Sequence, residues 1–178
     1  GTNAGGCANG TKRQSTLEHW YNLIKAHPEL ASSKMWIDYG SLRACQVEFD
    51  TATVIQIVRE CGTVAVFMDD EMDFMQRIWC VFEIYAAKRA GAKVICQMCG
   101  SNSEKLERSL TMHPVCSANA KAHSPDDLKK IRDYIEFSGG FEEIDKMVTQ
   151  AMLHDCTHMT GLAPRLQQRL HEFLSRCQ

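Results

Sequence analysis

The chain has 178 residues, of which 44% are hydrophobic, and a formal net charge of -2. A chain of this length and apolar content can bury one ordinary core, so disorder over most of its length is not expected. The near-neutral, evenly scattered charge gives no electrostatic case for nucleic acid or a membrane surface as partner. No apolar run approaches the roughly 18 residues that cross a membrane.

The cysteine content indicates a compartment. The chain has nine cysteines, an odd number, and several fall in segments that we predict to be helix or strand, namely Cys61, Cys80 and Cys96. A free cysteine in such a position behaves as a small apolar residue. We therefore expect a reducing, intracellular compartment, either cytoplasm or an organelle interior, and no disulfide framework.

The first 33 residues open with a tail and continue as a helix. Residues 1–14 are rich in glycine and show no periodicity, which predicts an extended tail. A helix capped by Ser15 or Thr16 and ended by Pro28 is expected next. Its apolar face follows the spacing of a helical stripe: Leu17, Trp20, Tyr21 and Ile24.

Residues 34–98 alternate between strand and helix patterns. Strands are expected at 34–39, 63–69 and 92–98, with a helix at about 48–60 and another from about Met72 to a stop at Gly91. The predicted apolar stripe of the helix at 48–60 comprises Phe49, Ala52, Ile55 and Arg59, widened by Val54, Ile57 and Val58. Alternation of this kind predicts an α/β fold with a small parallel sheet joined by right-handed crossovers.

The remaining residues are predicted to be helical. Ser124-Pro125-Asp126-Asp127 is a strong helix start, and Ser138-Gly139-Gly140 is its stop. Further helices are expected from Phe141 to about Met152 and from Pro164. The predicted organisation is thus a tail at 1–14, an α/β domain at 15–110, and a helical extension at 111–178 that packs on it.

Several motifs together resemble the Toll/interleukin receptor (TIR) fold, and more closely a TIR-like family abundant in unicellular algae and other protists. The resemblance covers about residues 34–150, and its most specific element is Arg77-x-Trp79-Cys80-x-Phe82-Glu83. The other matching segments are Trp36-Ile37-Asp38, Gln46, Ala120-Lys121-Ala122, Asp126-Asp127 and Gly139-Gly140-Phe141. This resemblance implies a flavodoxin-like, TIR-type strand order.

The resemblance also implies candidate site residues. In TIR domains that hydrolyse NAD, the catalytic glutamate occupies the position of Glu83, where a carboxylate can stabilise the cation formed as nicotinamide leaves. Asp38 and Asp69, at the carboxyl ends of parallel strands, and the neighbouring Trp79 would then help to bind the nucleotide. In the alternative structural interpretation, Glu83 pairs with Arg77 or Lys88, and Trp79 is a core residue.

Two departures from the TIR pattern favour a protein without catalytic activity. Residues 1–9 stand where the family places its first strand but do not have the pattern of an apolar strand. The loop after Asp38 has no run of glycines or small polar residues to bind phosphates. The sequence therefore predicts an interaction or scaffold module, an accessory subunit of a larger assembly, with no cofactor. Its protein partners are expected at the tail 1–14 and the C-terminal helices. The alternative function is an NAD glycohydrolase that uses Glu83.

Metal sites are a further alternative, which we do not favour. Cys96 and Cys99, followed by His113 and Cys116, have spacings compatible with zinc, but residues three apart in a continuous strand point to opposite faces. A looser His-x-Cys-x-His sequence lies at 154–158. The acidic side chains of Asp69, Asp70 and Asp73 are expected to favour the start of the following helix.

Overall fold

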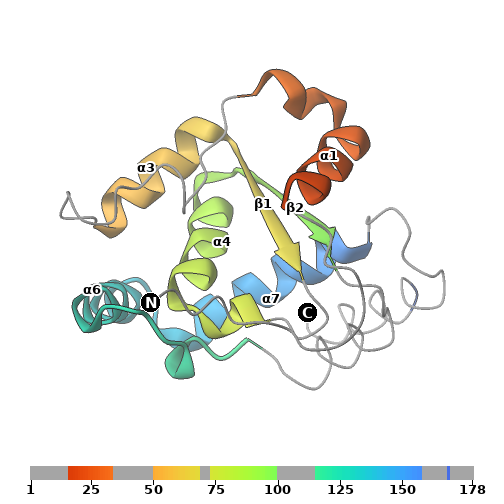
Figure 1. The fold of residues 1–178 in the computed structure, drawn as a ribbon. Helices are drawn as coiled ribbons and strands as arrows, with labels where there is room; N and C mark the ends of the chain where they lie inside the picture. Colours follow the sequence, from red (N-terminus) through yellow and green to blue (C-terminus); the bar gives the residue numbers. More distant parts are fainter. Residues whose placement is uncertain (1–15, 34–49, 69–72, 100–114, 158–167, 169–178) are drawn as a thin grey trace, which may run out of the picture.

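The computed structural model describes residues 16–33, 50–68, 73–99 and 115–157, together with Gln168 (Figure 1). Five α-helices, two strands and three short 3-10 helices are formed within these ranges. In chain order they are α1 (Thr16–Ala26), η1 (Pro28–Ser32), α3 (Thr51–Cys61), β1 (Thr63–Met68), η2 (Asp73–Gln76), α4 (Ile78–Ala90), β2 (Lys93–Met98), η3 (Ser117–Asn119), α6 (Pro125–Phe137) and α7 (Phe141–Thr157).

The two described strands form a parallel pair. β1 and β2 align from Thr63 opposite Lys93 to Met68 opposite Met98, and α4 connects them. The predicted strand-helix-strand unit and the α/β class with a small parallel sheet are therefore confirmed. The strand predicted at 34–39, like the tail at 1–14, lies outside the described residues.

Helices cover both faces of this strand pair. Because successive strand residues point to opposite faces, Val66 and Cys96 join the main core with α4 and α7, whereas Ile95 faces the other way. Ile95 packs with Leu23 of α1 and Leu30 of η1, and the partly buried residues of this small cluster are Trp20, Ala65 and Phe67. The sheet thus lies between α1 on one face and α4 with α7 on the other (Figure 1).

Helix α4 is the central packing element. Its buried side chains point in almost every direction around the helix: Ile78, Val81, Phe82, Ile84, Tyr85, Ala86 and Ala87. It contacts both strands as well as α3, α6 and α7. The main core therefore unites the strand pair with the C-terminal helices, and α4 has buried residues on most of its circumference because it is enclosed.

The start of α4 differs from the prediction. We expected a helix from about Met72, but residues 73–76 form a 3-10 turn and the α-helix begins at Ile78. Arg77 is extended and bridges Lys121: the Lys121 amide donates to the Gln76 carbonyl at 2.8 Å, and the Ile78 amide donates to the Lys121 carbonyl at 2.9 Å. This long-range pairing interrupts the helix that local sequence favours.

Two predicted helix faces were also wrong in part. In α1 the buried residue is Leu23, whereas Tyr21 is 66% exposed, because the helix rests on the sheet through Trp20 and Leu23. α3 begins at Thr51, where the Asp50 carboxylate caps the Thr53 amide at 2.7 Å. Val54 and Val58 are its buried residues, while Ala52 and Arg59 are exposed.

The C-terminal helices agree with the prediction. Ser124 caps α6 by accepting from the Asp127 amide, Pro125 is the first helical residue, and Gly139 and Gly140 both have positive φ at the junction with α7. α7 continues to Thr157, beyond the expected end near Met152. The helix predicted from Pro164 lies outside the described ranges. None of the described helices combines the length and apolar character that crossing a bilayer requires.

Candidate functional site

Trp79 and Glu83 lie one turn apart on α4, as their spacing predicts, and both are half-buried. The Trp79 indole Nε1 donates a hydrogen bond of 3.4 Å to Oδ2 of Asp127 on α6, and its ring meets Phe82 edge-on at 6.1 Å between centroids. Trp79 therefore packs against the core and links α4 to α6, as the structural interpretation expects.

Of the acids predicted to bind a nucleotide or to favour the start of α4, only Asp73 lies within the described residues. Asp38 and Asp69 lie outside the described residues, and so does Asp70, although β1 ends at Met68, immediately before Asp69. Asp73 begins η2 rather than an α-helix, and its carboxylate accepts a 3.4 Å hydrogen bond from the side-chain Nε2 of Gln76.

The cysteines of the zinc-like spacing do not form a shared site in the described part of the chain. The Cys96 thiol is buried against α7, 3.8 Å from the Met152 sulfur, and the Cys99 thiol lies 3.8 Å from the Gln97 carbonyl oxygen. Cys116 is exposed, and its sulfur accepts a hydrogen bond from the side-chain Nδ2 of Asn119 at 3.2 Å. Within the described ranges no three His, Cys, Asp or Glu residues gather as metal ligands. His113 and His158 fall outside those ranges.

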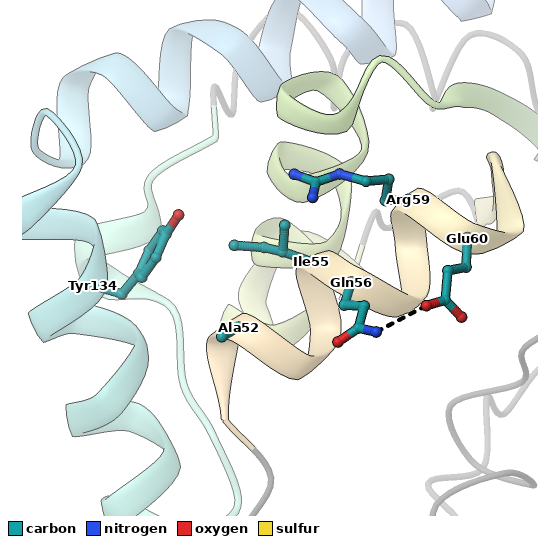
Figure 2. Close-up of a pocket in the computed structure, with 6 residues that line it drawn as sticks. All are labelled: Ala52, Ile55, Gln56, Arg59, Glu60 and Tyr134. Atoms are coloured by element: carbon teal, nitrogen blue, oxygen red, sulfur yellow. Dashed lines mark hydrogen bonds between the residues drawn. The ribbon is translucent and has the colours of Figure 1, made fainter.

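An open groove lies between α3 and α6. The volume of this groove is about 630 Å³. Figure 2 shows the side chains that line it. Five of its lining residues come from α3 and one from α6: Ala52, Ile55, Gln56, Arg59, Glu60 and Tyr134. Sequence reasoning missed this groove because it forms only where two helices distant in sequence pack side by side. The single local signal was Arg59, a charged residue at the edge of an apolar stripe.

The polar groups of the groove are separated around α3. Figure 2 shows the Arg59 guanidinium, the Ile55 side chain and the Tyr134 ring directed toward the same space. On another side of α3, Nε2 of Gln56 donates to Oε1 of Glu60 at 2.9 Å. Tyr134 is held by Phe82, whose ring it meets edge-on at 5.3 Å. The space between α3 and α6 therefore presents one cation and one hydroxyl beside apolar carbon.

The Asp50 carboxylate at the start of α3 has a lowered pKa. The Thr53 amide, by hydrogen bonding to the Asp50 carboxylate, lowers the pKa of that group, and the positive charge of Lys130 on α6 lowers it slightly further. The ionised carboxylate thus caps the first turn of α3.

Comparisons of the chain with protein-family models, with curated proteins and with solved structures find no significant match.

Proposed function

We propose that this protein is a non-catalytic protein-interaction module, an accessory subunit of a larger assembly. The observation that carries the proposal is Phe137, whose side chain is 91% exposed at the end of α6. Aromatic residues, including phenylalanine, are enriched in protein interfaces relative to the rest of the surface. The backbone at Phe137 is held in the last turn of α6, because the Ser138 amide donates to the carbonyls of Tyr134 and Ile135.

The packing of α4 supports the same proposal. The helix that bears Glu83 has buried side chains on most of its circumference, and Trp79 is engaged with Asp127. A residue that holds two helices together is constrained in its movement toward a nucleotide. The contacts of Trp79 thus give this motif residue a packing role that needs no catalysis.

The test measures the molecular mass, under native conditions, of the tagged full chain purified from its source cells. We expect a complex of fixed stoichiometry with an interface above about 1,000 Å². Phe137→Ser should release the partner without changing the melting temperature, because the ring is already exposed. Glu136→Ser, an adjacent exposed position on the same helix, serves as the matched control. A chain that migrates alone, or a partner retained equally by both variants, refutes the proposal.

A second candidate is a TIR-type NAD glycohydrolase that uses Glu83. It is favoured by one feature, the half-buried Glu83 one turn after Trp79 on the helix that follows β1. A carboxylate in such a partly desolvated position can stabilise a developing cation. Under this candidate Asp38, Asp69 and Trp79 would bind the NAD.

Nicotinamide release from NAD distinguishes the two candidates. The glycohydrolase requires turnover by the wild-type chain, abolished by Glu83→Ala and retained by Glu142→Ala, an exposed acid on α7. Turnover that survives Glu83→Ala assigns catalysis to another residue. Complete absence of turnover, under conditions where an active TIR domain works, leaves the interaction module.

A further inference from the structure

We propose that the groove between α3 and α6 binds a small organic monoanion, namely a carboxylate with an apolar body. Neither candidate function above uses this groove. Its volume of about 630 Å³ lies within the range of small-molecule sites, roughly 300–1,000 Å³. Two separate elements form its walls, and both belong to the packed core of the protein.

The recognition groups are the Arg59 guanidinium and the Tyr134 hydroxyl. Both side chains point into the groove (Figure 2), and neither polar group makes a hydrogen bond or ion pair with the residues that the structure describes. A guanidinium presents a planar pair of donors that matches a carboxylate. The hydroxyl can donate a further hydrogen bond to the same anion.

The charge of the lining favours a single negative charge on the ligand. Arg59 is the one cation among the lining residues and Glu60 the one acid, so the wall is formally neutral. Glu60 accepts from Gln56 on another side of α3 and is thereby held away from Arg59. A monoanion can pair fully with Arg59, whereas a dianion such as phosphate would retain an unpaired charge, because the lining residues offer no second cation.

The apolar body of the ligand would lie on carbon. Ile55 projects between Arg59 and Tyr134 in Figure 2, and Ala52 lines the same groove one turn earlier. The Tyr134 ring, steadied by its edge-on contact with Phe82, supplies a flat wall. Burial of apolar ligand surface here would add to the pairing at Arg59.

The test uses 3-phenylpropionate as probe, with 3-phenylpropanamide as its uncharged equivalent. The full chain is labelled with nitrogen-15 and titrated by NMR. For a probe of about 11 non-hydrogen atoms we expect a Kd on the order of 1 mM. Amide shifts should concentrate in α3 and α6, and the uncharged probe should bind about tenfold more weakly.

Variants assign the recognition groups. Arg59→Gln should weaken binding of the carboxylate about tenfold, and Tyr134→Phe roughly threefold. Lys129→Gln, which removes the same charge from an exposed position on α6 outside the groove, should leave the Kd unchanged. Circular dichroism of each variant checks that it remains folded.

Several results would overturn the proposal. The first two are equal binding of the charged and uncharged probes, and amide NMR shifts centred away from α3 and α6. The others are no amide shift at about 10 mM probe, and a folded Arg59→Gln variant that binds 3-phenylpropionate as well as the wild type does. Tighter binding of inorganic phosphate than of the carboxylate would equally exclude the monoanion preference. These results are independent of partner capture and of NAD turnover, so the ligand proposal can fail without either candidate function failing.

Discussion

The edge-on contact between Phe82 of α4 and Tyr134 of α6 predicts a measurable energetic coupling between the α/β part and the C-terminal helices. The ring centroids are 5.3 Å apart and the planes are inclined at 85°. Phe82 is completely buried, and Tyr134 is partly buried against the same core. The perturbation is a double-mutant cycle that combines Phe82→Leu with Tyr134→Leu.

The magnitude follows from the geometry. Phe82→Leu keeps most of the apolar volume, so we expect it to lower the free energy of unfolding by about 1 to 1.5 kcal/mol. An edge-to-face pair at this separation contributes about 0.5 to 1.5 kcal/mol beyond area burial. The double variant should therefore be less destabilised than the sum of the two single variants by about 1 kcal/mol.

Urea unfolding, followed by circular dichroism and extrapolated linearly, measures each corner of the cycle. The control cycle pairs Phe82→Leu with Tyr21→Leu on α1, where the ring is 66% exposed and belongs to no cluster with Phe82. That pair should be additive within about 0.5 kcal/mol. A coupling between Phe82 and Tyr134 no larger than the control would refute the packing of α6 on α4.

Three further predictions concern the caps. Ser124→Ala should lower the free energy of unfolding by about 1 kcal/mol in urea, because α6 loses the hydroxyl that accepts from the Asp127 backbone amide. Aspartate can also cap a helix, so a Ser124→Asp variant that is as unstable as Ser124→Ala would contradict this capping role. Gly91→Ala should cost about 1 kcal/mol through backbone strain alone, since φ is +70° and an added Cβ meets open space; unchanged stability would exclude this strain. The pKa of Asp50 is lowered in the folded state. The stabilisation of the folded protein by the ionised Asp50 cap should therefore be complete above the unfolded pKa of about 3.9 and be lost as the pH falls through the folded pKa. Asp50→Asn should reduce the dependence of the free energy of unfolding on pH in this range. An unchanged dependence would show that the Asp50 carboxylate does not cause it.

The candidate-site residues divide according to how local their signals are. The spacing of Trp79 and Glu83 predicts their shared face on α4, and the structure shows them one turn apart. The Trp79 hydrogen bond to Asp127 was not predictable, because it depends on where α6 docks. The groove was missed for the same reason: Arg59 and Tyr134 acquire a common role only when α3 and α6 meet.

Several features of the fold could be predicted because residues next to one another in the chain decide them. The βαβ alternation, the helix stop at Gly91, the cap at Ser124 and the break at Gly139 and Gly140 all follow from local backbone preference and short-range periodicity.

Contacts between distant segments fix where α4 begins, which side of α1 is buried, and where a ligand-sized space opens. Lys121 pairs with the chain around Arg77 and delays the helix to Ile78, and the sheet face selects Leu23 over Tyr21. The physical reason is shared by these cases: the deciding hydrogen bonds and apolar contacts come from segments far along the chain, whose positions no local pattern encodes.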